Sequence, residues 1–243
     1  MGRAHEVRAK SMAATAAAKS ALYNRMSRDI YLAAKKGSTD PNANIALRSA
    51  IDKAKKQQVP SHVIENAIKK AAGGTGEALI GNVYEGYGPG NSAIIVETLT
   101  DNVNRAFTEV RSAFTKCGGT IGTNGCVSYM FTKYAVIEFT GKSEDEALEI
   151  LLEAGVDVID ASTDEEGYVR VLAEPSALEA MEQAFAAAGI NEFDTDEVKL
   201  IPSDEVVLTD EKLVKFERLL SMLDEVDDVQ KVYHNVKLPE ESE

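Results

Sequence analysis

The spacing of apolar residues changes at a glycine-rich segment, residues 73–77 (GGTGE). Before this segment, apolar residues recur every three or four positions, which is the pattern of one buried helix face. After it, short runs rich in Val and Ile alternate with further helical patterns, which is typical of an α/β protein. Because 243 residues exceed the usual size of a single core, we expect two or three domains, with the helical one first.

The segment before the glycines predicts three helices. Gly37 is placed to end the first helix. Asp40 followed by Pro41 predicts the N-cap and first turn of the second. Pro60 separates the second helix from the third. The apolar stripes are narrow and rich in alanine, so we expect this bundle to depend on docking to other residues for its stability.

Strands and helices alternate in the rest of the chain, in an order that fits two ferredoxin-like units. The predicted strands are residues 93–99, 120–122, 127–131, 134–139, 156–160, 168–172, 197–201 and 229–236. The predicted helices begin at Asp101, Ser143, Pro175 and Thr209. We therefore predict an α+β fold, with an N-terminal three-helix bundle followed by two ferredoxin-like α/β domains, the third inserted into the second.

The predicted domain boundaries follow from this order. The basic three-helix domain is 1–78, the split ferredoxin-like domain is 79–132 plus 203–243, and the inserted ferredoxin-like domain is 133–202. The alternative is three sequential domains, in which the C-terminal segment packs on the domain before it.

Charge is divided unequally along the chain. Residues 1–76 carry 14 Lys and Arg against 5 Asp and Glu, a net charge of +9, and the other 167 residues carry 12 against 35, a net charge of −23. A basic segment joined to an acidic body is typical of a protein that contacts nucleic acid with one end. The alternative is that the basic segment pairs with the acidic body or forms a solvated helical face.

The basic side chains before the glycine-rich segment are the candidate nucleic-acid contacts. They are Arg3, Arg8, Lys10, Lys19, Arg25, Arg28, Lys35, Lys36, Arg48, Lys53, Lys55, Lys56, Lys69 and Lys70. The chain has no Trp, and this segment lacks a regular aromatic pattern. We therefore expect these residues to contact phosphates and to recognise shape, not to read bases.

A second candidate is the glycine-rich loop over residues 86–90 (GYGPG). Its glycine spacing matches neither a Walker A loop nor a dinucleotide-binding fingerprint. As an exposed loop it would present tyrosines for stacking on bases. The candidate residues are Tyr84, Tyr87, Gly88, Pro89 and Gly90. The alternative is a tight turn in which the glycines permit positive φ.

The sequence nominates no catalytic residue, metal ligand or cofactor. His5, His62 and His234 are scattered, and neither a nucleophile elbow nor a zinc-binding His pair occurs. Cys117 and Cys126 are too few for a disulfide framework and fit a reducing compartment. Because no apolar run is long enough to span a membrane or to form a secretory signal, we expect a cytoplasmic protein with no membrane partner. Because no catalytic motif occurs, we expect a non-enzymatic one.

Three segments resemble the signature segments of the YebC family, which includes the mitochondrial translational activator of cytochrome c oxidase. They are QVPSHVIENAIKKAAGG, YEGYGPGNSAIIVETLTDNVNRAFTEVRSAFTKCGGTIGTNGCVSYMF and LDEVDDVQKVYHNV. The resemblance covers nearly the whole chain. At the start, MGRAHEVRAK replaces the Gly-His-Ser-Lys-Trp motif common in the family and is more like the shorter YeeN-type branch.

The resemblance implies an N-terminal three-helix domain and two α/β domains. It also implies a regulator of gene expression, because members are described as transcriptional regulators that bind DNA and as ribosome-associated translation factors that relieve stalling. We therefore expect the basic domain to bind nucleic acid, either DNA or ribosomal and transfer RNA, and the acidic domains to offer a surface for a protein partner.

The spacing of polar residues bears on whether the nucleic acid is DNA or RNA. No cluster of Arg, Asn and Gln has the spacing of a DNA recognition helix, which favours the ribosome. The alternative to a nucleic-acid-binding regulator is a small-molecule-sensing or protein-interaction module built on paired ferredoxin-like domains.

Overall fold

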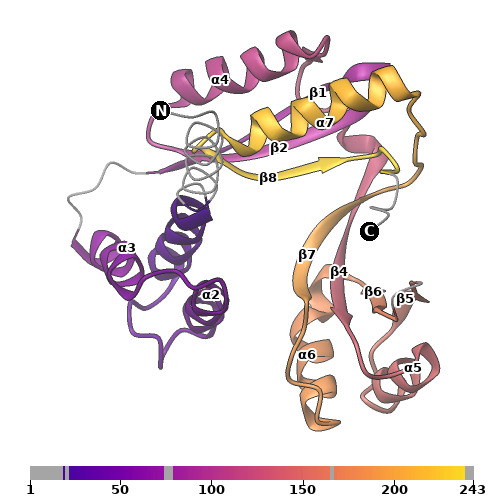
Figure 1. The fold of residues 1–243 in the computed structure, drawn as a ribbon. Helices are drawn as coiled ribbons and strands as arrows, with labels where there is room; N and C mark the ends of the chain where they lie inside the picture. Colours follow the sequence, from indigo (N-terminus) through magenta and orange to yellow (C-terminus); the bar gives the residue numbers. More distant parts are fainter. Residues whose placement is uncertain (1–18, 20–21, 74–78, 165–166, 239–243) are drawn as a thin grey trace, which may run out of the picture. The chain divides into compact units, whose positions relative to one another are not determined.

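The structure is a computed structural model, and it describes residues 19, 22–73, 79–164 and 167–238. The chain divides into two compact units. The first unit is Met1–Val127 with Val207–Glu243, and the second unit is Ser128–Val206. Helices come first along the chain and two antiparallel sheets follow, so the predicted mixed α/β class with N-terminal helices is confirmed (Figure 1).

The N-terminal helices enclose a small core. They are residues 22–36, α2 (Ile45–Lys56) and α3 (Ser61–Gly73). Their buried residues are Ile30, Ala34, Leu47, Ile51, Ala54, Val59, Ile64 and Ala67. Alanine contributes little apolar area, so a core with this composition stabilises the three helices weakly.

The start of α2 differs from the predicted one. The Asp40 carboxylate accepts a hydrogen bond from the Asn42 backbone N–H at 2.9 Å, which forms a turn before the helix. The N-cap is Asn44, whose Oδ1 accepts from the backbone N–H of Leu47 at 3.0 Å. The Asp-Pro pair therefore marks a turn, and the helix begins four residues later than Pro41.

The first unit contains a four-stranded antiparallel sheet in the order β3-β1-β2-β8. Its strands are β1 (Ile80–Tyr87), β2 (Ala93–Thr100), β3 (Thr120–Ile121) and β8 (Val229–His234). A short 3-10 helix, η1 (Pro89–Asn91), connects β1 to β2. Two helices, α4 (Val103–Lys116) and α7 (Asp210–Asp224), cover one face of the sheet and pack against each other (Figure 1).

Strand β1 was not predicted as a strand. It contains Gly81 and Gly86, which weaken any propensity for extended structure. It nevertheless pairs with β2 along its full length, from Ile80 opposite Thr100 to Tyr87 opposite Ala93. The strand therefore owes its conformation to a hydrogen-bonding partner and not to its own composition.

Two further predictions for this part of the chain are wrong. The predicted strand 127–131 is instead a 3-10 helix, η2 (Ser128–Met130), followed by a strand of the second unit. The N-cap of α4 is Asn102 and not Asp101, and its Oδ1 accepts from the Arg105 backbone N–H at 3.1 Å. Asp101 instead forms an ion pair with the Arg105 side chain at 2.7 Å.

The second unit contains another four-stranded antiparallel sheet, in the order β5-β6-β4-β7. Its strands are β4 (Phe131–Phe139), β5 (Val158–Thr163), β6 (Val169–Ala173) and β7 (Thr195–Pro202). The 3-10 helix η3 (Pro175–Ala177) leads into α6 (Leu178–Ala187), and α5 (Glu144–Glu153) follows β4. The predicted capping box at the start of α5 is confirmed by reciprocal bonds between Ser143 and Glu146.

The core of the second unit lies between its sheet and both of its helices. Phe139 of β4 packs against Phe185 of α6 with ring centroids 4.8 Å apart. Leu151 of α5 and Met181 of α6 are fully buried in the same cluster. The two helices therefore cover the same face of the sheet. Within the residues that the structure describes, no helix has the length and apolar composition needed to cross a membrane.

Candidate nucleic-acid interface

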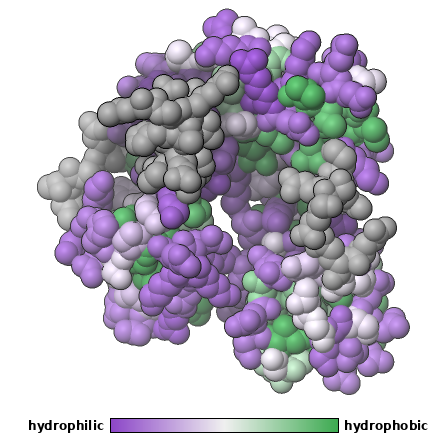
Figure 2. Space-filling model, viewed as in Figure 1, coloured by the Kyte–Doolittle hydropathy of each residue, from purple (hydrophilic) through white to green (hydrophobic). Residues whose placement is uncertain are grey.

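Lysines occupy the solvent side of the N-terminal helices. Because α2 buries Leu47, Ile51 and Ala54, the helical repeat turns Lys56 away from the core and places Lys55 at the edge of the buried face. Both are exposed. Both also lie in the last turn of α2, where positive charge is favoured by the helix dipole. Hydrophilic residues cover the side of α2 that faces the viewer in Figure 2.

Other predicted lysines are exposed in the same way. The set that is exposed at helix ends comprises Lys35, Lys36, Lys55, Lys56, Lys69 and Lys70, which we call the exposed lysines. Lys19 is also exposed and Lys53 is half-buried. Arg3, Arg8 and Lys10 lie outside the described residues.

Local ion pairs leave the exposed lysines accessible. Lys55 Nζ lies 3.7 Å from Asp52 Oδ1, and Lys69 Nζ lies 3.8 Å from Glu65 Oε2. All four side chains are at least 60% exposed. Pairs of this kind contribute at most about 1 kcal/mol, so a phosphate can replace the carboxylate at little cost.

The arginines of the same segment behave differently, because each described one donates hydrogen bonds within the chain. Arg25 pairs with Asp224 at 2.6 Å, and Arg28 pairs with Asp228 at 2.7 Å. Arg48 donates to the backbone carbonyls of residues 41 and 42 at 3.2 and 3.1 Å. The proposed pairing of the basic segment with the acidic body thus holds for Arg25 and Arg28, whereas the exposed lysines form a separate set.

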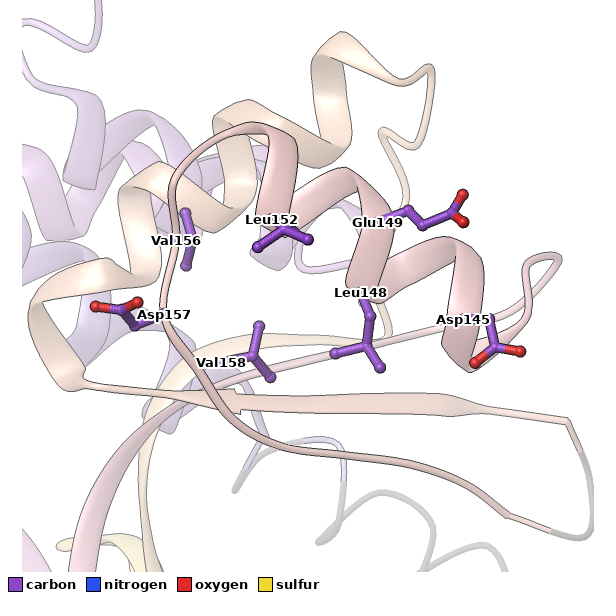
Figure 3. A pocket seen from close by; sticks show the side chains of 7 residues that line it. All are labelled: Asp145, Leu148, Glu149, Leu152, Val156, Asp157 and Val158. Atoms are coloured by element: carbon purple, nitrogen blue, oxygen red, sulfur yellow. The ribbon is translucent and has the colours of Figure 1, made fainter.

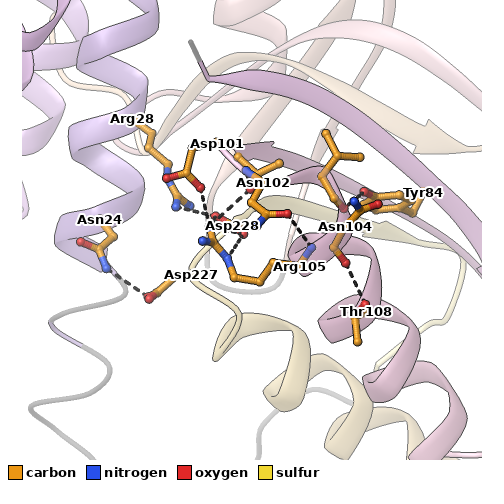
Figure 4. A network of polar contacts seen from close by, with 12 residues as sticks. Asn24, Arg28, Tyr84, Asp101, Asn102, Asn104, Arg105, Thr108, Asp227 and Asp228 are labelled. Carbon is orange, nitrogen blue, oxygen red and sulfur yellow. Dashed lines mark hydrogen bonds and ion pairs between the residues drawn. The ribbon is translucent and has the colours of Figure 1, made fainter. Parts of the chain in front are cut away.

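Asp228 is the centre of the contact between the first helix and the sheet. Its side chain is 0% exposed, and it follows α7 in the turn before β8. It accepts from Arg28, and from Arg105 of α4 at 2.9 to 3.1 Å (Figure 4). Hydrogen bonds to Asp228, and then to Asp101, raise the pKa of Arg105 above its ordinary value. One buried carboxylate therefore connects residues from three distant parts of the chain.

Two surface contacts support this docking. Asn24 Nδ2 donates to Asp227 Oδ1 at 3.0 Å (Figure 4), and Arg25 contacts Asp224 as described above. The small N-terminal core is thus attached to the first sheet by side chains of a single helix. Asp227 and Asp228 carry no sequence signal that separates them from the other carboxylates of the acidic body.

Asn44 is a second residue whose role only the structure shows. Its side chain is buried and makes three hydrogen bonds, because Nδ2 donates to the carbonyls of Ala33 and Ser38 while Oδ1 caps α2. It therefore connects the end of the first helix to the start of α2. This contact sets the angle between two helices that carry exposed lysines.

Replacing Asn44 with alanine is expected to lower the opening free energy of α2 by about 1–2 kcal/mol, because a cap and two buried carbonyl partners are lost together. Amide hydrogen exchange of α2 measures this change. Asn42→Ala is the matched control, since Asn42 is exposed and its hydrogen bonds with Asp40 and Arg48 are made by its backbone N–H and C=O. Equal effects of the two changes would contradict the assigned role.

The glycine-rich loop is mostly packed against the body. The Tyr84 ring lies 5.7 Å from the Phe107 ring, and burial raises the pKa of the Tyr84 hydroxyl. The Tyr87 hydroxyl donates to the Cys126 carbonyl at 2.8 Å. Gly88 and Pro89 are buried. These positions leave both tyrosine rings engaged within the protein.

Gly90 is the exposed member of the predicted loop residues, with φ of +72°. An added Cβ there would meet the Leu208 side chain at 2.6 Å. Its backbone conformation favours glycine, and a larger residue would also have to displace the Leu208 side chain. The tight-turn interpretation therefore accounts for Gly90.

The same region contains a buried carboxylate that the sequence did not single out. Glu85 of β1 accepts from the backbone N–H groups of Gly125 and Val127 at 2.8 and 3.0 Å. Burial, with the Glu85 charge as the second cause, raises the pKa of the Cys126 thiol. A thiol held in its protonated form is a poor nucleophile. No group of three metal-binding side chains occurs in the described part of the chain.

The fold and the site together define a mixed α/β protein with an exposed set of lysines on its N-terminal helices. The chain belongs to the TACO1/YebC family. Residues 3–74 match the family's N-terminal domain, and residues 80–236 match its second and third domain. The predicted family is therefore confirmed.

Relatives cover the chain from end to end. Proteins named "Probable transcriptional regulatory protein" are 49% identical in Marinobacter nauticus, over 99% of this chain and 100% of the relative, and 48% identical in Pseudoalteromonas atlantica, over 100% of both. The crystal structure of the conserved hypothetical protein Aq1575 from Aquifex aeolicus is similar, with a TM-score of 0.79 and 37% identity over 92% of each chain. These matches support a regulatory role at the level of the family.

Proposed function

We propose that this protein regulates gene expression by binding the phosphate backbone of nucleic acid through its N-terminal helices. The observation that carries the proposal is the separation of charge. The exposed lysines belong to a segment of net charge +9, whereas the second unit has 20 Asp and Glu against 4 Lys and Arg. A polyanion is attracted to the first and repelled by the second.

The type of cation supports contact with phosphates over readout of bases. Arginine is the residue that most often recognises guanine through paired hydrogen bonds. The described arginines of the segment, Arg25, Arg28 and Arg48, all donate within the chain. Apart from Arg48, the exposed cations of the described segment are lysines, which act as point charges on phosphate oxygens.

This arrangement favours structured RNA on the ribosome over specific sites in duplex DNA. The exposed polar residues of α3 include His62, Glu65 and Asn66 together with two lysines, and they form no paired donor set for a major groove. The proposed cytoplasmic location and non-enzymatic role follow from this partner. Arg3, Arg8 and Lys10, which lie outside the described residues, are included in the proposed contact by their charge alone.

The test is co-sedimentation with ribosomes in parallel with binding to a duplex DNA of mixed sequence, both at one physiological salt concentration. The proposal expects ribosome binding and weak, sequence-independent DNA binding. Tight DNA binding without ribosome binding would favour the transcriptional role, and binding to neither would overturn the proposal.

Salt dependence provides a second prediction. For a surface of lysines, the logarithm of the affinity is expected to fall by about 0.7 to 0.9 per phosphate neutralised for each unit of log salt. Affinities for ribosomes, measured over a series of KCl concentrations, give this slope. An affinity that does not change with salt would contradict an interface made of the exposed lysines.

We also propose the finer organisation of the body. Strands β5-β6-β4-β7 with α5 and α6 on one face have the order of a ferredoxin-like domain. In a ferredoxin-like domain, the neighbour of β3 in the sheet would be the strand that follows β3 in the sequence. In the first sheet β1 occupies that position, and with this exchange the strand order is equivalent. We propose the domain limits 1–78, 79–132 plus 203–243 and 133–202 for this organisation, with the difference that β4 already begins at Phe131.

A further inference from the structure

The second unit contains an apolar hollow of about 570 Å³ between α5 and β5. Figure 3 shows Leu148, Leu152 and Val158 beside the space between the helix and the strand, and the Glu149 carboxylate directed outward from the helix. The lining residues are Asp145, Leu148, Glu149, Leu152, Val156, Asp157 and Val158. Four of these seven are aliphatic, and the other three are exposed carboxylates, so the lining is both apolar and acidic.

The helix supplies a second apolar stripe that the core does not use. Ala147 and Leu151 of α5 are buried against the sheet. Leu148 and Leu152 lie on the adjacent side, one turn apart. Leu152 is 77% exposed. An exposed leucine beside a hollow is typical of a surface that another chain covers.

The strand beside the hollow is at the edge of its sheet. β5 pairs with β6, and the strand order places nothing on its other side within the described residues. An edge strand presents free backbone N–H and C=O groups that accept an added strand. Ile159 of this strand is 47% exposed. The groove and the edge together offer both side-chain and backbone contacts to an extended peptide.

The charge at the groove selects the chemistry of the peptide. Asp145, Glu149 and Asp157 are exposed, and no ion pair to them occurs among the described residues. They belong to a unit with 20 acidic and 4 basic residues. Such a field repels acidic chains, including the same unit of a second copy, and attracts a basic segment.

We propose that this groove, formed by α5 and β5, binds an extended basic segment of a partner protein. The segment adds as a strand beside β5. Its apolar side chains contact Leu148, Leu152 and Val158, and its lysines or arginines face Asp145, Glu149 and Asp157. This surface belongs to the second unit and does not depend on the nucleic-acid contacts of the N-terminal helices.

The probe for this proposal is a fluorescein-labelled ten-residue peptide in which Val and Lys alternate along one face of the strand and Thr occupies the other face. It is titrated into the full-length protein and followed by fluorescence anisotropy. Binding is expected to protect the amides of β5 from hydrogen exchange, while those of β7, the other edge, remain unchanged. The same peptide with Glu in place of Lys is expected not to bind.

The variant Glu149→Lys/Asp157→Lys is expected to weaken binding by on the order of tenfold, because two attractive charges become repulsive. Leu152→Ser is expected to weaken it as well, without unfolding, since Leu152 is mostly exposed. The control is Glu192→Lys/Glu205→Lys, which makes the same change of charge at exposed positions that flank β7, at the opposite edge of the sheet. Circular dichroism checks that each variant is folded.

Several results would overturn the proposal. The first is no binding at about 100 μM peptide, which would place the dissociation constant well above that concentration. The others are an equal loss in the control variant and no protection of β5. Self-association of the protein that the peptide displaces would show instead that a second copy occupies the groove through its basic helices.

Discussion

The Asp228→Ala variant is expected to lower the opening free energy of the first helix and of α4 by about 3 kcal/mol. A buried ion pair that loses one partner leaves an unpaired charge, and this costs about 3–5 kcal/mol. The lower end applies because the Arg105 side chain is 44% exposed, although that of Arg28 is only 17% exposed. Amide hydrogen exchange over residues 22–36 and 103–116 measures the effect separately from the second unit.

Two controls separate the buried charge from the surface contacts. Asp224→Ala removes the ion pair with Arg25, but the Asp224 side chain is 65% exposed, so a loss below about 1 kcal/mol is expected. Asp228→Asn keeps the shape of the side chain and one acceptor oxygen. Its loss of opening free energy is expected to lie between those of Asp224→Ala and Asp228→Ala. If Asp224→Ala had an effect as large as Asp228→Ala, the central role of Asp228 would be wrong.

Reversing the charge of Lys55 and Lys56 is expected to weaken nucleic-acid binding by on the order of a hundredfold. Each phosphate contact contributes close to one unit in the logarithm of affinity at about 0.1 M salt. Because the residues are exposed, the chain remains folded, although acidic residues at the end of α2 cost about 0.3–1 kcal/mol each through the helix dipole. Filter binding or co-sedimentation with ribosomes measures the affinity.

A graded series makes this test specific. Lys55→Gln/Lys56→Gln removes two charges and is expected to have an intermediate effect. Lys133→Glu/Lys215→Glu makes the same total change of charge at exposed positions outside the N-terminal helices, and it is expected to leave the affinity nearly unchanged. Equal losses in both reversed variants would indicate that net charge, and not the exposed lysines, controls binding.

Local patterns in the sequence predicted much of the secondary structure. The capping box at Ser143 and the helix break at Pro60 both depend on neighbouring residues, and both occur where expected. The errors at Asp40 and Asp101 have one cause. Each carboxylate had a competing partner close by, a turn N–H or an arginine, and an asparagine supplied the cap instead.

The candidate site was only partly accessible to the same reasoning. The charge of the N-terminal segment is a property of composition, so the sequence could nominate every basic residue in it. It could not separate the arginines from the lysines, because Arg28 meets its partner 200 residues away. Likewise, Tyr84 and Tyr87 are suited to stacking on bases, but Phe107 and Cys126 engage them from the following segment.

What the sequence by itself determined is the change from N-terminal helices to an α/β pattern, most of the later helices, the family and the division of charge, since periodicity, motifs and composition are local properties of the chain. The tertiary structure decided that β1 is a strand, that Asp228 joins Arg28 to Arg105, and that lysines remain at the surface of the N-terminal helices. These features arise from hydrogen bonds and ion pairs between distant segments, which form only when folding brings the segments together and removes a carboxylate such as Asp228 from water.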